Sequence, residues 1–296
     1  MRKTIAVKTL GPANWIQFIE ENRELALNTS PDEVLIDFSG ARFLQPMHVV
    51  SLACLIEIYA LKGAKIFIRQ GTYNINRYLL NIRLGEYWNE GFDRNAFTPL
   101  KIDTTFCLWK VKNSMIDSYA TQAQRYFQNS YFEGKDLQSL HISLTEVFNN
   151  IFDHSASPVD GYVITQCFPN IGQIVTSICD MGVGIPTKIN QIWEAGGKGR
   201  LNDEDALRAA FIRKISSKSQ PHNRGFGLAN LFEIIKRLNG QLMVLSNNAV
   251  FQRLSNGITT TYPSNISFNG TLIVITLDKR YLPDVEHEVD GEEFIF

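Results

Sequence analysis

The residues from Leu140 to His154 constrain the fold most, because they read as one helix with two unlike faces. Apolar side chains recur at the spacing of a helix that packs on a core, namely Leu140, Leu144, Val147, Phe148 and Ile151. The other face carries Glu146, Asn150, Asp153 and His154. These carboxylate, amide and imidazole groups can bind a metal ion, orient a water or move a proton. The alternative interpretation is an ordinary solvated face.

Length and composition set the class of protein. A chain of 296 residues, 44% hydrophobic and 20% charged, suits one large domain or two medium ones. The net charge of −1 gives no general attraction to nucleic acid, so direct nucleic-acid binding is not expected. No apolar run of about 18 residues and no signal-peptide pattern occurs, so we expect no membrane span. Four cysteines without paired spacing favour reduced thiols and a cytoplasmic location.

Residues 1–98 are expected to form a small α/β domain. Strand patterns at 4–8, 33–38 and 65–69 alternate with helical patterns at 12–27 and 47–61. The stretch from Val34 to Gly40 and the following Arg42-Phe-Leu-Gln-Pro-Met resemble the STAS family of anti-sigma-factor antagonists. In that family an Asp-Ser pair usually opens the next helix and the Ser accepts phosphate, whereas Gln45-Pro46 stands here. The resemblance therefore implies a domain that docks a protein partner, and an unrelated α/β unit is the alternative.

A polar stretch at 95–105 marks the expected boundary, and residues 105–282 form the expected second domain. Its strand patterns lie at 106–111, 162–168, 173–179, 242–246, 251–254, 258–262 and 271–277. Its helical patterns lie at 117–131, 136–152 and 203–213, with another helix opening after residue 223. Residues 283–296 form an acidic tail that is expected to be loose.

Asp180 ends an apolar strand, and Gly182 and Gly184 follow it closely. A carboxylate at a strand end can accept a hydrogen bond from an exocyclic amine such as that of adenine. Glycines beside it let the backbone approach a flat base without a Cβ in the way. The alternative interpretation is an Asx-type turn that needs glycine for its geometry.

A second glycine motif stands at a helix start. Gly225 and Gly227 leave backbone N–H groups at the positive end of the helix dipole, which is a place for phosphate. Lys218 and Arg224 add positive charge nearby, although loop lysines and arginines are often simply solvated. The glycine-lysine signature of P-loop nucleotide-binding proteins does not occur in the sequence.

These motifs follow one another in an order that resembles the GHKL ATPases over about residues 105–280. That superfamily includes DNA gyrase B subunits, ninety-kilodalton heat-shock chaperones, histidine kinases and MutL proteins, and anti-sigma-factor serine kinases share its nucleotide-binding domain. The resemblance implies a two-layer α/β sandwich, with a mixed, mainly antiparallel sheet and helices on one face. It also implies that ATP and Mg²⁺ are bound.

The resemblance assigns roles on the first helix and at the strand end. Asn150 would coordinate Mg²⁺, and Glu146 would act as general base on water or on an acceptor hydroxyl. Asp153 matches an acidic residue of the MutL and gyrase proteins. Asp180 would bind the adenine amine, and the glycines that follow it would shape the adenine pocket.

Further roles fall later in the chain. Gly225 and Gly227 would contact the phosphates. Residues 194–224 would form a mobile lid, in which Lys218 matches a basic residue of some members. Gly270-Thr271 resembles the closing Gly-Thr of the family, which would place Thr271 at the nucleotide site.

The leading functional prediction is Mg²⁺-dependent ATP hydrolysis coupled to lid closure and to the regulation of a protein partner. Asn150 and His154 also resemble the Asn-x-x-x-His pattern of anti-sigma serine/threonine kinases, so transfer of phosphate to a protein is an alternative. A nucleotide-gated binding module without turnover is another. Several relatives dimerise with ATP bound, which leaves a homodimer open.

Overall fold

The structure is a computed structural model, and it describes residues 1–89, 91–92, 101–111, 115–154, 157–212 and 227–285. It confirms the predicted α/β class. The N-terminal unit contains a three-stranded parallel sheet in the order β1-β2-β3. Its elements are β1 (Arg2–Lys8), α1 (Pro12–Asn28), β2 (Glu33–Gly40), α2 (Pro46–Leu61), β3 (Lys65–Arg69) and α3 (Tyr73–Asn81).

The rest of the described chain is built on a six-stranded sheet in the order β4-β5-β6-β7-β9-β8. Its strands are β4 (Lys101–Ile102), β5 (Thr105–Lys110), β6 (Tyr162–Phe168), β7 (Gln173–Asp180), β8 (Gln241–Arg253) and β9 (Thr259–Asp278). Its helices are α4 (Ile116–Ser130), α5 (Gln138–His154), α6 (Ile185–Ala195), α7 (Asp203–Ala210) and α8 (Gly227–Arg237). All strand pairs in the described part of this sheet are antiparallel, whereas a mixed, mainly antiparallel sheet was expected.

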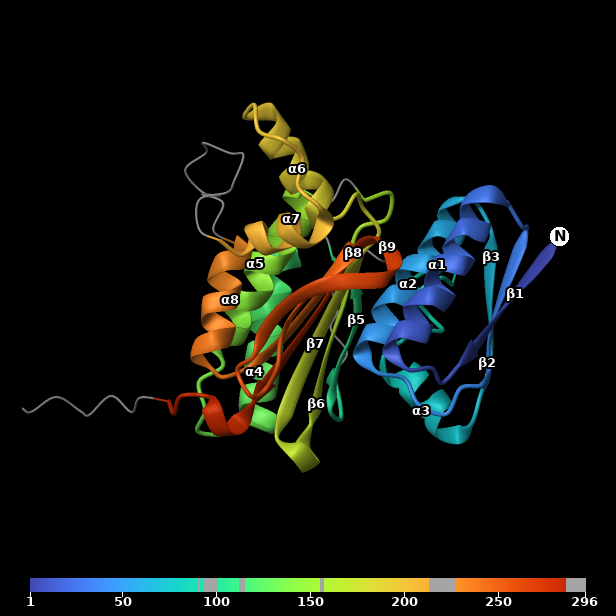
Figure 1. The fold of residues 1–296 in the computed structure, drawn as a ribbon. Coiled ribbons are helices and arrows are strands. Elements are labelled where there is room, and N and C mark those ends of the chain that lie inside the picture. The colour runs from blue at the N-terminus through green and yellow to red at the C-terminus, as the bar shows by residue number, and fades with distance from the viewer. Residues whose placement is uncertain (90, 93–100, 112–114, 155–156, 213–226, 286–296) are drawn as a thin grey trace, which may run out of the picture.

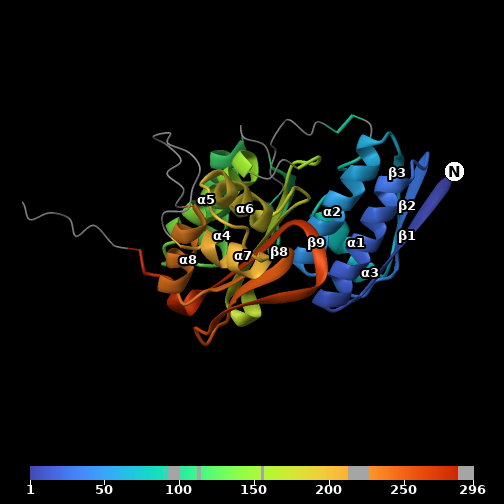
Figure 2. The same cartoon turned by 45° about the horizontal axis from the view of Figure 1, so that its top comes forward.

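The elements stack in four layers (Figures 1 and 2). Helices α1 and α2 lie between the two sheets, and α4, α5 and α8 cover the other face of the six-stranded sheet. The α2 sequence is apolar around its whole circumference, as expected for a helix buried on every side. Helix α5 has one apolar stripe, because only one of its faces meets a sheet.

One buried cluster joins the N-terminal unit to the larger sheet. It includes Trp15 of α1, Leu55 of α2 and Ile36 of β2, together with Ile164 and Cys179 of the larger sheet. A fully buried aliphatic side chain contributes about 1.5–3 kcal/mol, so a cluster of this kind holds the two units firmly together. A second cluster lies between the opposite face of the sheet and α4, α5 and α8.

A buried carboxylate crosses the same contact. Glu57 of α2 is 1% exposed. It accepts hydrogen bonds from Lys110 Nζ at 2.9 Å, Trp88 Nε1 at 2.7 Å and Tyr162 Oη at 3.0 Å. Lys110 and Tyr162 lie on β5 and β6, so this network links α2 to two strands of the larger sheet.

Two parts of the fold differ from the sequence prediction. Helix α6 was not expected, because glycines and Pro186 surround its start; proline is, however, favourable in the first turn of a helix. The four short strands predicted between 242 and 277 form two long ones, β8 and β9. Their ladder continues past Pro263 because its register shifts on either side of Asn247, which leaves room for the irregular residues.

Among the residues that the structure describes, no helix has the length and apolar character needed to cross a membrane.

Candidate functional site

The topology brings three sequence motifs to one end of the larger sheet. Strand β7 ends at Asp180, and β6 begins at Tyr162, which pairs with Cys179. Ser157, between α5 and β6, accepts the N–H of Met181 at 3.2 Å, so the C-terminal part of α5 also lies at the Asp180 end. Helix α8 leads into Gln241, which pairs with Thr276 toward the opposite end, so its first residue, Gly227, lies at the Asp180 end.

Asp180 faces the same side of the sheet as α5 and α8. Side chains alternate along a strand, and Ile178 packs in the cluster with those helices, whereas Cys179 and Met181 pack against the N-terminal unit. Asp180 is 2% exposed. Its Oδ1 accepts the N–H of Gly182 at 2.8 Å, and the Thr271 side chain also hydrogen bonds to the carboxylate. Thr271 is its partner across the β7–β9 ladder.

Burial sets the protonation of Asp180. It raises the pKa of this carboxyl to about 6, although the hydrogen bonds from Gly182 and Thr271 and the positive charge of Arg23 act in the opposite direction. At neutral pH the group is therefore an ionised, desolvated acceptor.

Asp37 gives an internal comparison, because its Oδ1 accepts the Ser39 N–H at 2.9 Å in the same Asx-type arrangement. Its hydrogen bonds with Ser39 and its pairing with Arg69 lower its pKa. The two aspartates share a local turn, but Asp37 is 9% exposed and pairs with Arg69, whereas Asp180 is 2% exposed. The Asx turn therefore explains the backbone geometry at Asp180, but it does not explain why this carboxylate is buried.

Gly270 lies against the same strand end. Its φ is +149°, and a Cβ at this position would collide with the Asp180 carbonyl oxygen. Only glycine permits so close an approach of β9 to β7, and this approach places Thr271 beside the Asp180 carboxylate. The register of β8 and β9 shifts here, and we call this irregular point of β9 at Gly270 the kink. Ser246 Oγ donates to the Gly270 carbonyl at 2.7 Å and so holds the kink from the β8 side.

Gly184 is required by packing within the fold. It adopts φ +81° at the start of α6, and a Cβ there would collide with the Asn247 side chain. Ser246 Oγ accepts the N–H of the next residue, Ile185, at 2.9 Å. These contacts account for glycine at this position, and its part in an adenine pocket stays a prediction, as does that of Gly182.

For the polar residues of α5, the structure gives their positions along the helix. Glu146 is half-buried on this helix. Asn150 and Asp153 lie one and two turns closer to its C-terminal end, which is the Asp180 end of the sheet; their side chains lie outside the described part of the structure. Lys218, Arg224 and Gly225 also lie outside the described residues, and Gly227 begins α8.

Sequence reasoning did not identify the contribution of the N-terminal unit to this site. Arg23 of α1 donates to the carbonyl of Met181, directly after Asp180, and to the carbonyl of Asn269, two residues before Thr271. No local pattern in the sequence predicts this contact, because Arg23 and Met181 are 158 positions apart.

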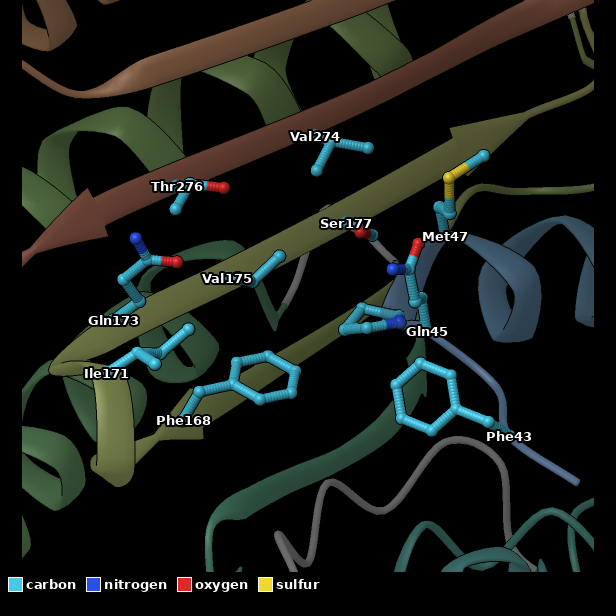
Figure 3. A pocket seen from close by; sticks show the side chains of 11 residues that line it. Phe43, Gln45, Met47, Phe168, Ile171, Gln173, Val175, Ser177, Val274 and Thr276 are labelled. Atoms are coloured by element: carbon cyan, nitrogen blue, oxygen red, sulfur yellow. The ribbon is translucent and has the colours of Figure 1, made fainter. Parts of the chain in front are cut away.

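A separate cleft of about 260 Å³ opens on the other face of the sheet (Figure 3). Phe43, Gln45 and Met47, around the start of α2, face side chains of β7 there, including Val175 and Ser177. Because Ser177 and Asp180 are three positions apart on one strand, their side chains point to opposite faces. This cleft is therefore not part of the Asp180 site.

The described residues contain no group of three or more His, Cys, Asp or Glu side chains that would hold a metal ion unaided. A Mg²⁺ ion bound by one or two protein oxygens and by substrate phosphates does not need such a group. The chain matches no model of a known protein family, and no curated protein matches its sequence.

Proposed function

We propose that the six-stranded sheet and its helices bind ATP with Mg²⁺ and hydrolyse it. The observation that carries the proposal is the arrangement at one end of the sheet. There, a buried aspartate at a strand end, the C-terminal half of a polar-faced helix and the N-terminus of a second helix come together on one face. The GHKL resemblance of the sequence supports the same site.

Asp180 would bind the adenine amine. A carboxylate has about four acceptor positions, and the hydrogen bonds from Gly182 and Thr271 occupy two of them. The remaining positions can accept a donor such as an exocyclic N–H. In a buried site, an amine that fails to donate leaves a desolvated charge unpaired, so this contact would discriminate between bases.

Helix α8 would bind the phosphates. The N–H groups of its first turn have no acceptor within the helix, and they and the positive end of the dipole favour anions. The prediction adds Gly225, Lys218 and Arg224 to this contact. Mg²⁺, held by Asn150 and the phosphates, would neutralise phosphate charge. Glu146, one turn before Asn150, would hold the attacking water and accept its proton.

The protein partner expected at the N-terminal unit belongs to the same proposal, and so does the homodimer that the sequence leaves open. The homodimer is tested by the dependence of the oligomeric state on protein concentration, with and without ATP.

The first test is ATP binding by wild type, Asp180→Asn and Asp37→Asn, measured by equilibrium titration with Mg²⁺ present. Asp180→Asn should weaken binding by about 10- to 100-fold, the usual contribution of a hydrogen bond to a charged group. Asp37→Asn removes a carboxylate from a similar turn outside the site and should leave the affinity unchanged. Equal losses in both variants would show that the assignment of adenine to Asp180 is wrong.

The second test separates hydrolysis from the alternatives. Phosphate release is measured for wild type, Glu146→Gln and Glu133→Gln, the last at an exposed glutamate before α5. Glu146→Gln should reduce turnover by about 10²- to 10⁴-fold, the usual contribution of a general base, while ATP binding persists. ATP binding without phosphate release in wild type would favour a gated binding module. Transfer of label from ATP to a separate protein would favour a kinase.

A further inference from the structure

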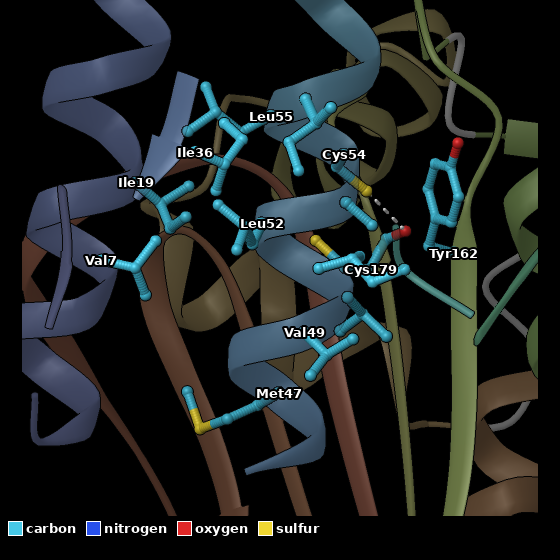
Figure 4. Close-up of a cluster of buried hydrophobic side chains, with 14 of the residues drawn as sticks. Val7, Ile19, Ile36, Met47, Val49, Leu52, Cys54, Leu55, Tyr162 and Cys179 are labelled. Atoms are coloured by element: carbon cyan, nitrogen blue, oxygen red, sulfur yellow. Dashed lines mark hydrogen bonds between the residues drawn. The ribbon is translucent and has the colours of Figure 1, made fainter. Parts of the chain in front are cut away.

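The N-terminal unit holds the backbone on both sides of Asp180. Cys54 of α2 donates through its thiol to the carbonyl of Cys179 at 3.3 Å, a contact drawn in Figure 4. Arg23 of α1 donates to the carbonyl of Met181 at 3.5 Å. Both residues that flank Asp180, Cys179 on β7 and Met181 directly after the strand, therefore bind helices of the N-terminal unit, while Asp180 itself faces the other side of the sheet.

The same arginine also reaches β9. Arg23 donates to the carbonyl of Asn269, and Asn269 Nδ2 donates to Glu20 Oε2 at 3.2 Å. Glu20 and Arg23 lie 3.5 Å apart as an ion pair, and each is less than one-tenth exposed. Asn269 directly precedes Gly270, where β9 has its kink, and Thr271, which pairs with Asp180. One buried ion pair on α1 thus contacts β9, just before Thr271, and the residue that directly follows Asp180.

A buried ion pair is a costly way to join two units, because both charges lose their hydration. The apolar contacts between α1, α2 and the sheet already supply hydrophobic stabilisation. The ion pair adds hydrogen bonds that depend on direction. Its charged donor holds particular carbonyl oxygens in place, which apolar contacts cannot do. The positions held in this way are those beside Asp180 and Thr271.

We propose that Glu20 and Arg23 are positioning residues for the Asp180 site, and that through them the N-terminal unit sets the affinity for the nucleotide. This inference rests on the proposed function. Coupling between two sites is reciprocal, so a nucleotide at Asp180 must in turn stabilise the seating of α1. A partner that draws α1 away from β7 and β9 would then lower nucleotide affinity without touching the nucleotide.

The test uses the full chain with Glu20→Gln and Arg23→Met together, which removes both charges and leaves no uncompensated ion. The matched control is Arg2→Met with Glu33→Gln, an exposed ion pair of the same unit at 3.9 Å. Arg23→Lys is the conservative variant, because it keeps a cation that can donate to a carbonyl. The measurements are ATP affinity with Mg²⁺ and hydrogen exchange of α1 and of the Gly182 amide, with and without ATP.

We expect the double variant to bind ATP about ten-fold more weakly, within the usual range of coupling between sites. ATP should slow exchange in α1 of wild type and control, and this effect should disappear in the double variant. Without ATP, the Gly182 amide should exchange faster in the double variant, because its acceptor is less firmly held. Arg23→Lys should recover part of the affinity, and it replaces the double variant if that one does not fold.

Wild-type affinity and unchanged α1 protection in a folded double variant would overturn the inference. If wild type binds no ATP, the proposed function is wrong, and the Gly182 amide then decides whether the ion pair positions this strand end. Unchanged Gly182 exchange in that case would overturn the positioning role as well.

Discussion

At the residue scale, Asp180 combines burial with a pKa raised from an ordinary value of 3.8 to about 6. The sign of its effect on stability follows. Below pH 3.8 the carboxyl is protonated in both the folded and the unfolded chain, and the raised pKa adds nothing to the pH dependence. Between pH 3.8 and about 6, the unfolded carboxyl ionises freely, whereas the folded one must ionise in a desolvated site. The free energy of unfolding therefore decreases over this pH range.

Asp180→Asn should consequently gain stability relative to wild type as the pH rises from 4 to 7. Relative to wild type, its free energy of unfolding should increase by about 2–3 kcal/mol between pH 4 and pH 7, the linkage expected from this pKa shift. Urea denaturation at the two pH values measures it. Asp37→Asn, at a carboxyl with a lowered pKa, should not show this gain, and the same pH trend in both variants would contradict the explanation.

The raised pKa also bears on ligand binding. An amine donates more strongly to the ionised carboxylate than to the neutral acid, so ATP affinity in wild type should fall as the pH is lowered through about 6. Titrations between pH 5 and pH 8 measure the change. The Asp180→Asn variant should show no midpoint near pH 6, and a midpoint that persists in this variant would assign the transition to another group.

At the element scale, the kink of β9 at Gly270 brings Thr271 to the Asp180 strand end. Gly270→Ala should destabilise the protein by roughly 3–5 kcal/mol, because its new methyl group would meet backbone atoms of Asp180 and Met181, which cannot move aside independently. Thermal denaturation followed by circular dichroism measures the loss.

Gly257→Ala is the matched control for the kink. This glycine, in the connection between β8 and β9, also has a positive φ of +84°, but the nearest atom is the far end of the Arg253 side chain, at 3.8 Å from the added Cβ. Its cost should be limited to about 1–2 kcal/mol of backbone strain. Equal costs at both glycines would show that φ, and not the close approach, is what requires glycine at 270.

At the scale of the whole molecule, the two sheets are joined through a shared core and through Glu57. Glu57→Leu removes the buried partner of the Lys110 ammonium, which is 12% exposed and keeps only the exposed Asp160 at 3.4 Å. It also removes the acceptor of the Trp88 and Tyr162 donors, so it should destabilise the protein by about 3–5 kcal/mol. Adding Lys110→Met should restore much of that stability. Glu86→Gln at the exposed Arg83–Glu86 pair should change stability by less than about 1 kcal/mol.

Denaturation of these variants also reports on cooperativity. A shared core predicts one unfolding transition for the described parts of both units, whether followed by circular dichroism or by tryptophan fluorescence. Two separate transitions would mean that the N-terminal unit unfolds independently of the larger sheet.

Local sequence patterns were sufficient to predict many of the helices and strands. The strands at Lys65–Arg69 and Tyr162–Phe168 have the predicted bounds. The helix predicted from residue 203 begins there, and Asn202 caps it, because its Oδ1 accepts the Asp205 N–H at 2.7 Å. These features depend on residues a few positions apart, whose spacing and side-chain chemistry are visible in the sequence. Helix α6 was not predicted for a related reason, since the glycines that precede it were interpreted as a base-binding segment or a turn.

The sequence by itself determined the period of each helix and strand and the order of the polar motifs, because both are local properties of the chain. Only the tertiary structure decided that the ends of α5, α8 and β7 meet on one face, that Asp180 is buried with a raised pKa, and that Arg23 holds the backbone beside it. Burial, desolvation and contacts between residues 158 positions apart arise only when separate elements pack together, and no local pattern encodes which elements those will be.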